Sequence, residues 1–129
     1  MERLNIMIVD DSSLVAKILT ATLVQLGHKV VATARTGSAA LFAYKSCNPD
    51  VVLMDITMPD MDGIEATRNI VQSYPDARIV IVTSHGDESL IGNALKAGAK
   101  GYIRKPFNVE RLRTTLEQVV KANLAVLNC

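Results

Sequence analysis

Five short apolar segments alternate with helix-like segments along the chain, and this alternation limits the possible folds more than any other feature of the sequence. Three of these segments are rich in Val, Ile, Leu and Met, which is typical of strands buried on both faces. The other two are less apolar, which predicts strands at the edges of a sheet. The strongly apolar segments are Leu4–Val9, Val51–Met54 and Arg78–Val82, and the weaker ones are Val30–Ala34 and Tyr102–Arg104.

The segments between the strands have the periodicity of amphipathic helices. The positions expected to face the core are Val15, Ile18, Leu19, Thr22 and Leu26, then Ala40, Leu41 and Tyr44, then Ile64, Thr67, Ile70 and Val71, then Leu90, Ile91, Ala94 and Leu95, and finally Val109, Leu112, Leu116, Val119, Val120 and Leu127. Glycine, proline and asparagine mark the helix boundaries. The expected stops are Gly27, Asn48-Pro49, Pro75 and Gly98, and Asn108 is expected to cap the last helix.

Five successive strand–helix units predict the α/β class, with a single doubly wound sheet of five parallel strands and right-handed crossovers. With the most apolar strands at the centre, the strand order is 2-1-3-4-5, as in a flavodoxin-like (βα)5 fold. A length of 129 residues suits one domain, so we expect residues 1–129 to form it.

Polar residues follow the predicted strands at the points where the strands end. Asp10 and Asp11 follow the first strand, and Asp55 follows the third. Thr83 and Lys105 follow the fourth and fifth strands. Because parallel strands end at the same edge of a sheet, all five side chains are expected to lie in one crevice.

Three clustered carboxylates repel one another strongly unless they bind a cation or hold a proton. With oxygen ligands and no His or Cys nearby, the expected ion is Mg²⁺ or Mn²⁺. Asp55 is then placed to act as a nucleophile toward phosphorus and to form an acyl phosphate. Lys105 and Thr83 are suited to pair with phosphoryl oxygens.

The stretches IMIVDDSS, DVVLMDITMPDMDGIEA, IVIVTSH and AGAKGYIRKPF occur in this order along the chain. In sequence and spacing the chain resembles the receiver domain of bacterial two-component response regulators, from about Leu4 to Val120. The stand-alone chemotaxis regulators are the variety that it is most similar to. The resemblance implies a single receiver domain whose aspartate is phosphorylated by a partner protein.

The resemblance also implies a role for each site residue. Asp55 is the implied phosphoacceptor. Asp10, Asp11 and Asp55, with the backbone carbonyl of Thr57, are the implied Mg²⁺ ligands. Thr83 and Lys105 would sense the phosphoryl group, and Tyr102 would turn inward when Thr83 moves. The Lys105–Pro106 peptide bond is expected to be cis.

Two further positions are expected to tune the lifetime of the acyl phosphate. Thr57 lies two residues beyond Asp55, and His85 lies two residues beyond Thr83. Both would flank the approach of a hydrolytic water, although a solvent-exposed His85 without a role is an equally simple interpretation.

The implied partners are a sensor histidine kinase or histidine phosphotransfer protein and a downstream protein target. The target is expected on the face formed by the fourth helix, fifth strand and fifth helix. This face lies in the basic part of the chain, since residues 96–129 carry a net charge of +5 and residues 1–95 carry −4. The absence of a dense Lys/Arg run makes nucleic acid an improbable direct partner. The apolar end of the last helix, with Leu124, Ala125, Val126 and Leu127, suits core coverage or a weak dimer contact in an otherwise monomeric protein.

A cytoplasmic location without membrane contact is expected for this chain. The N-terminal apolar run is too short for a signal peptide or a membrane span. Cys47 and Cys129 have no spacing typical of a metal or redox site.

Four other functions compete with the stand-alone switch. A phosphorelay intermediate and the input half of a truncated DNA-binding regulator share the same site chemistry. A magnesium-dependent phosphohydrolase would turn over external substrates, but it usually has a second acid where this chain has Thr57. A flavin-binding module is disfavoured because Asp10 and Asp11 would repel the cofactor phosphate.

Overall fold

The computed structural model describes residues 2–58, 60–84 and 88–127, with side-chain surroundings as far as residue 121. Strands and helices alternate: β1 Asn5–Val9, α1 Ser13–Gln25, β2 Lys29–Ala34, α2 Gly37–Cys47, β3 Val51–Met54, α3 Gly63–Ser73, β4 Ile79–Thr83, α4 Glu88–Ala97, β5 Gly101–Arg104 and α5 Val109–Leu127. The five strands are parallel and lie in the order β2-β1-β3-β4-β5. The predicted fold class, strand order and edge strands are therefore confirmed.

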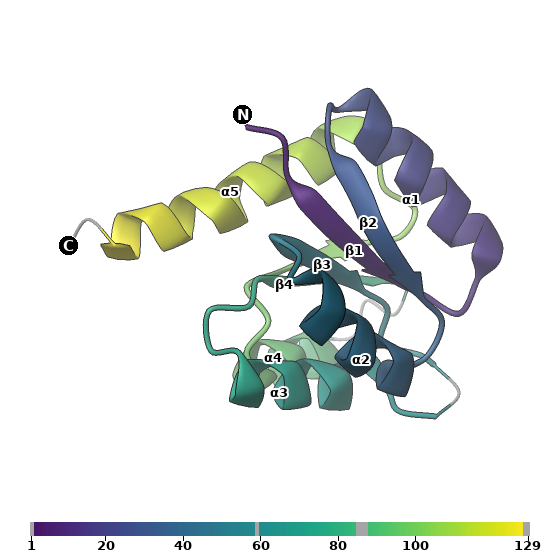
Figure 1. The fold of residues 1–129 in the computed structure, drawn as a ribbon, viewed down its shortest axis with the longest axis vertical. Coiled ribbons are helices and arrows are strands. Elements are labelled where there is room, and N and C mark those ends of the chain that lie inside the picture. The colour runs from purple at the N-terminus through teal and green to yellow at the C-terminus, as the bar shows by residue number, and fades with distance from the viewer. Residues whose placement is uncertain (1, 59, 85–87, 128–129) are drawn as a thin grey trace.

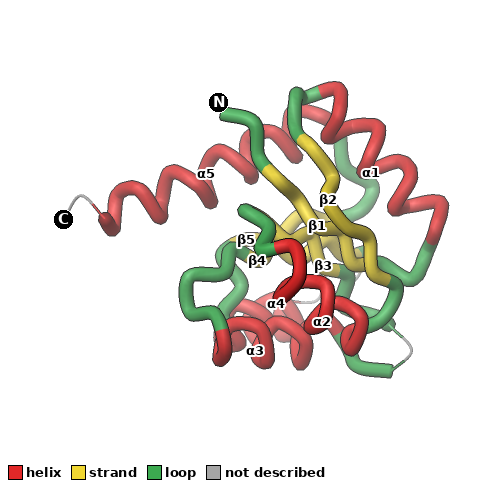
Figure 2. Tube along the Cα trace, in the orientation of Figure 1, coloured by secondary structure: helices red, strands yellow, loops and turns green. Residues whose placement is uncertain are grey.

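Two helical layers cover the sheet. In Figure 1, α1 and α5 lie on one face, and α2, α3 and α4 lie on the other. Figure 2 shows the strands in yellow between these helices. Each layer has its own apolar core, one centred on Met7, Met54 and Ile81 and the other on Ile8, Leu53 and Val82. Alternate residues of each central strand therefore serve opposite faces of the sheet.

The helix boundaries agree with the predicted stop and cap residues. Gly27 and Gly98 have φ angles of 93° and 118°, and Asn48 has a φ of 44° at the end of α2. These left-handed conformations end a helix at little cost in Gly and Asn. At the start of α5, the Arg111 amide donates to Asn108 Oδ1 over 2.7 Å, so the predicted cap is also confirmed.

Three residues predicted to face the core are exposed instead. Ile18, Leu95 and Val109 expose 50%, 45% and 37% of their surface. In α1 the buried positions are Leu19 and Leu23, and Leu23 was missing from the predicted face. The helix is apolar around most of its circumference, so hydrophobic periodicity does not define a single face. Leu95 follows the buried Ala94, and one helical step of about 100° turns it toward solvent.

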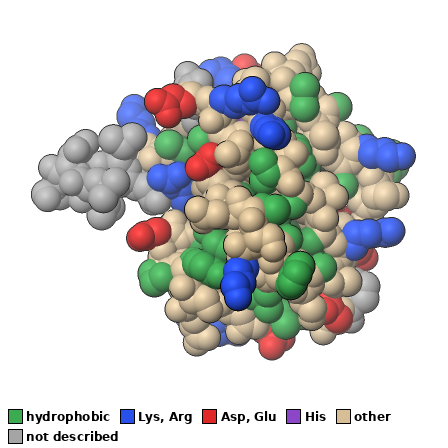
Figure 3. Space-filling model, viewed as in Figure 1, with side chains coloured by type: hydrophobic (Ala, Val, Ile, Leu, Met, Phe, Trp, Pro, Cys, Tyr) green, Lys and Arg blue, Asp and Glu red, His purple; other side chains and the backbone are tan. Residues whose placement is uncertain are grey.

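Apolar side chains are also exposed on α2. Phe42 on α2 exposes 77% of its surface, and Figure 3 shows hydrophobic side chains gathered over this helix. Exposed apolar residues are common on soluble proteins, so their presence alone does not indicate a binding surface.

Some predictions fall outside the described residues. The position of His85 is not described. The side chains of Leu124, Ala125, Val126 and Leu127 are likewise not described, so the predicted dimer contact stays a prediction. Among the helices that are described, none is long and apolar enough to cross a membrane.

Gly63 lies where α3 begins, against the end of β3. A Cβ atom at this position would lie 1.9 Å from the carbonyl oxygen of Asp55. The Gly63 amide also donates to the Ile56 carbonyl over 2.7 Å. The close approach brings the first turn of α3 onto the backbone that carries Asp55, so a side chain at residue 63 must displace this segment.

We expect Gly63→Ala to destabilise the protein by about 2–3 kcal/mol, because the added methyl group meets backbone atoms that cannot move aside cheaply. Urea unfolding followed by circular dichroism measures this loss. Gly92→Ala in α4 is the matched control, since its Cβ would meet no atom within 4 Å. Helix propensity predicts a gain of about 0.5–1 kcal/mol for the control. Equal stability of Gly63→Ala and the wild type would contradict the expected clash.

Candidate functional site

Asp10 lies directly after β1 and is held by backbone contacts on two sides. Its amide donates to the Ala34 carbonyl at the end of β2 over 3.0 Å. Its Oδ1 atom accepts a hydrogen bond from the Ser12 amide over 2.9 Å. Ser12 in turn caps α1, because its hydroxyl accepts from the Val15 amide. The start of α1 therefore fixes the orientation of the Asp10 carboxylate.

Asp55 lies directly after β3, the neighbour of β1 in the sheet. Its amide donates to the Val9 carbonyl over 2.8 Å, which extends the pairing of the two strands by one residue. The ends of β1 and β3 are thus joined where the two acids emerge.

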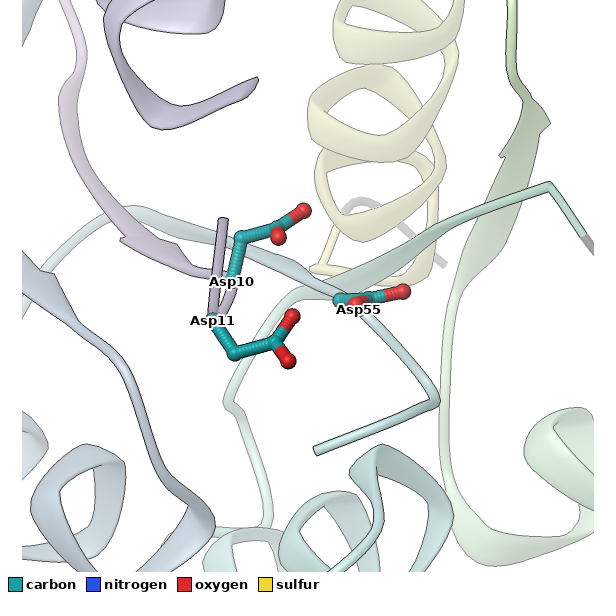
Figure 4. Close-up of side chains that lie close together, drawn as sticks. All are labelled: Asp10, Asp11 and Asp55. Carbon is teal, nitrogen blue, oxygen red and sulfur yellow. The ribbon is translucent and has the colours of Figure 1, made fainter. Parts of the chain in front are cut away.

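Asp10, Asp11 and Asp55 form one acidic cluster. Each offers a carboxylate oxygen, and these atoms lie within 4.8 Å of one another. Figure 4 shows the three side chains together at the ends of β1 and β3. Asp10 and Asp55 expose only 3% and 7% of their surface, whereas Asp11 is exposed. The predicted convergence of the three acids is confirmed.

Lys105 provides the positive charge beside this cluster. Its Nζ atom lies 2.9 Å from Asp10 Oδ2 and 3.7 Å from Asp55 Oδ1. The Lys105 amide donates to the Thr83 carbonyl over 2.8 Å, which ties the lysine to the end of β4. The Lys105–Pro106 peptide bond is cis, as predicted.

The environment of Asp55 disfavours its charged form. Burial raises the pKa of the Asp55 carboxyl above its ordinary value. The Lys105 ammonium opposes this rise in the pKa, whereas the negative charges of Asp10 and Asp11 add to it. A bound cation would relieve the same repulsion.

The other predicted site residues that the structure describes are Thr83, Tyr102 and Thr57. Thr83 is fully buried as the last residue of β4. Tyr102 in β5 is half-buried and packs against the core beneath α2, α3 and α4. Thr57 is exposed two residues beyond Asp55. Their places in the fold suit the predicted roles, and the roles themselves stay predictions.

Sequence reasoning missed a set of contacts around the turn between β2 and α2. Asp60 accepts hydrogen bonds from the amides of Gly37 and Ser38 and from the Ser38 hydroxyl. The Ser38 hydroxyl, together with these amides, lowers the pKa of the Asp60 carboxyl. Arg35 donates to the Asp11 carbonyl over 3.1 Å. No motif in the sequence indicates these long-range contacts.

The acidic cluster has the chemistry of a magnesium site. Mg²⁺ prefers hard oxygen ligands, and three carboxylates converge here with one of them open to solvent. Among the described residues, the cluster contains no His or Cys ligand that would favour zinc. The donor set therefore fits Mg²⁺ or Mn²⁺.

The comparisons with known proteins agree on one family. The family profile of the response regulator receiver domain matches residues 6–117. The chemotaxis protein CheY of Bacillus subtilis is 41% identical over 115 residues, which cover 89% of this chain and 96% of the relative. The transcriptional regulatory protein DegU of Brevibacillus brevis is 37% identical, with 92% of this chain covered but 51% of the relative.

A solved structure supports the same relationship. The complex of CheX with CheY, BeF₃ and Mg²⁺ from Borrelia burgdorferi contains a chain that is 36% identical to this one. The TM-score is 0.87, and the match covers 90% of this chain and 88% of that chain.

We expect Asp55→Asn to stabilise the protein in magnesium-free buffer at neutral pH, on the order of 1 kcal/mol. The raised pKa means that the folded protein keeps Asp55 protonated to a higher pH than the unfolded chain does. The free-energy cost of burying the charge of Asp55 is therefore absent below the pKa of Asp55 in the unfolded chain. The cost is complete above the pKa of Asp55 in the folded protein. The gain from the substitution should fall toward zero as the pH is lowered to about 4.

Urea unfolding at pH 7 and at pH 4 measures the two stabilities. Asp76→Asn is the control, because Asp76 is exposed and lies between α3 and β4. A stability gain that is the same at both pH values would contradict this account of Asp55.

Proposed function

The chain belongs to the response regulator receiver family, and we propose that it is a signalling switch in which a partner histidine kinase phosphorylates Asp55. The observation that carries the proposal is the cluster of Asp10, Asp11 and Asp55 with Lys105 within reach of two of the acids. We further propose that residues 1–129 act as a single receiver domain.

Asp55 is the nucleophile in this proposal. One carboxylate oxygen forms a bond to phosphorus while the bond from phosphorus to the donor imidazole breaks. The imidazole leaves with the electron pair of that bond: it is neutral if its other nitrogen already carries a proton, and otherwise it takes one from water. Lys105 already lies 3.7 Å from Asp55 and can pair with a phosphoryl oxygen there. The Thr83 hydroxyl is proposed to donate to another phosphoryl oxygen.

Asp10, Asp11, Asp55 and the Thr57 backbone carbonyl are the proposed ligands of Mg²⁺ or Mn²⁺. The ion, when bound, supplies positive charge that offsets the charges of the acids and of the phosphoryl oxygens. The chain's own acids position it, and Thr57 and His85 are proposed to control the access of water to the acyl phosphate.

The signal is proposed to leave the site through β4 and β5. Thr83 pairs with Arg104 in the sheet register, and the Lys105 amide bonds to the Thr83 carbonyl. Tyr102 lies on the same strand, two residues before Arg104. A shift of Thr83 and Lys105 toward a phosphoryl group therefore acts directly on β5 and Tyr102. The extent of this shift depends on how much more strongly the phosphoryl group binds the conformation in which Thr83 and Lys105 have moved toward it than the conformation in which they have not.

The face formed by α4, β5 and α5 is the proposed output surface. A groove of about 470 Å³ on this face is lined by Tyr102, Arg104, Pro106, Phe107, Asn108 and Arg111. Arg113 on the next turn of α5 is paired with Glu110 and Glu117. These acids interrupt the positive charge along α5, so the surface suits a protein target better than a nucleic acid.

A second candidate is the receiver part of a larger DNA-binding regulator. The match to DegU supports it, since this chain spans about half of that relative. A phosphorelay intermediate would use the same site to pass the phosphoryl group on. All three functions involve one phosphoryl group per chain, and none involves turnover of external substrates.

We expect acetyl phosphate and Mg²⁺ to add one phosphoryl group to the wild-type chain, because the small donor needs only the acidic cluster and Lys105. Asp55→Asn should abolish the mass increase, and removal of Mg²⁺ by a chelator should reduce it at least tenfold. Intact-protein mass spectrometry provides the measurement. Asp76→Asn at the far end of the molecule should behave as the wild type.

Continuous release of phosphate from generic esters, without an adduct, would instead support the hydrolase. DNA binding by the intact phosphorylated chain would contradict a purely protein-binding output.

We expect Thr83→Ala to separate phosphorylation from its structural effect. The nucleophile and the metal ligands stay in place, so acetyl phosphate should still modify Asp55. Without the hydroxyl, the amide signals of β5 and α5 should shift by less than half of the wild-type change. Two-dimensional NMR before and after phosphorylation measures this response, with Asp55→Asn as the unresponsive control. A full wild-type shift in Thr83→Ala would contradict the proposed route.

A further inference from the structure

We propose that the β2–α2 turn and the first residues of α2, residues 35–38, form with Asp60 a brace that holds both acid-bearing loops of the site in the geometry that Mg²⁺ requires. These loops are residues 10–12 after β1 and the described residues 55–58 and 60–62 after β3. The brace makes Arg35, Ser38 and Asp60 positioning residues for the metal. The inference rests on the proposed function, since Mg²⁺ belongs to that proposal.

The first arm of the brace joins the β3–α3 loop to α2. Asp60 Oδ1 accepts from the Gly37 amide over 3.0 Å, and Asp60 Oδ2 accepts from the Ser38 amide over 3.2 Å and from the Ser38 hydroxyl over 2.5 Å. The free amides at a helix start and the positive end of the helix dipole both favour a carboxylate. Three hydrogen bonds thus fix the distal part of the loop that begins with Asp55.

Packing reinforces this arm. A Cβ atom on Gly37 would lie 2.6 Å from Met61 Cβ and 2.9 Å from the Met61 carbonyl oxygen. The backbone of the turn therefore lies directly against the loop. Met61 also packs against the core beneath α2, α3 and α4, so the loop is held from both sides.

The second arm joins the same turn to the loop after β1. The Arg35 guanidinium donates to the Asp11 carbonyl over 3.1 Å, and the preceding Ala34 carbonyl accepts from the Asp10 amide. Asp11 is the exposed acid of the cluster, whereas Asp10 is fixed by Ser12 and Lys105. The Arg35 contact therefore restrains the backbone of the least confined metal ligand.

Both arms start from the four residues 35–38. They hold the loops after β1 and β3, which contribute the proposed metal ligands, whereas Lys105 lies in a third loop after β5. Mg²⁺ tolerates little departure from octahedral geometry, so its affinity depends on how well the ligands are held before it binds. Loss of an outer contact to a metal ligand typically weakens metal affinity at least tenfold. The brace is exposed at Arg35, Ser38 and Asp60, so its removal leaves no cavity in the core.

Isothermal titration with Mg²⁺ alone, on unphosphorylated wild type, Arg35→Ala, Ser38→Ala and Asp60→Ala, tests the brace. We expect Arg35→Ala and Asp60→Ala each to weaken Mg²⁺ binding about tenfold, with a smaller loss for Ser38→Ala. Urea unfolding of each variant measures whether the fold is retained.

A different result is expected if these variants act only by changing the charge near the site. Removing the Arg35 cation, which contacts the Asp11 carbonyl, should strengthen Mg²⁺ binding if only charge matters, whereas loss of the brace weakens it. Asp62→Asn is the charge control for Asp60→Ala, because Asp62 lies in the same loop but caps α3 through the Glu65 amide. Asparagine caps a helix as well as aspartate does.

Weaker binding in Arg35→Ala, together with a larger loss in Asp60→Ala than in Asp62→Asn, supports the brace. Unchanged or tighter binding in Arg35→Ala would overturn it, as would equal losses in Asp60→Ala and Asp62→Asn. Both of these results leave the proposed function intact. A wild-type chain that binds no Mg²⁺ would overturn the proposed function and the brace together.

Discussion

Electrostatic repulsion among Asp10, Asp11 and Asp55 is the constraint on which the rest of the site depends. Two carboxylates about 4 Å apart repel by roughly 4 kcal/mol at an effective dielectric constant of about 20. The parallel sheet holds the acids together in spite of this cost, because β1 and β3 are fully buried neighbours apart from Asn5. Lys105 offsets part of the repulsion through its contact with Asp10. The negative charge that remains makes a cation a favourable ligand, and a bound cation would in turn offset the charge of an anion brought to the site.

The sheet was predictable from the sequence because burial on both faces leaves an unambiguous apolar signal. The central strands β1, β3 and β4 have that signal, and the weaker β2 and β5 lie at the edges as expected. The orientation of α1 was harder to predict, since a helix with apolar residues on most sides can pack in several ways. The exposure of Ile18 and the burial of Leu23 are decided by the tertiary structure.

The acidic cluster was predictable for a related reason, since strand ends fix where Asp10, Asp55 and Lys105 emerge. The brace was not predictable, because Asp60 and Arg35 are ordinary surface residue types in loops. Their partners lie 22 to 24 residues away in sequence, and loop geometry alone brings them together. Sequence periodicity has no information about such contacts between loops, whereas it does locate the strand ends that carry the acids.

The ion pair between Lys105 and Asp10 joins residues that are 95 positions apart. Contacts of such long range form late, since the intervening chain must be in place before its ends can meet. During synthesis, the acids after β1 and β3 leave the ribosome well before the lysine that accompanies them. A chain that is still being made therefore has the acids without their counter-charge. The complete site, and with it the proposed phosphorylation, arises only when nearly the whole domain has been synthesised and folded.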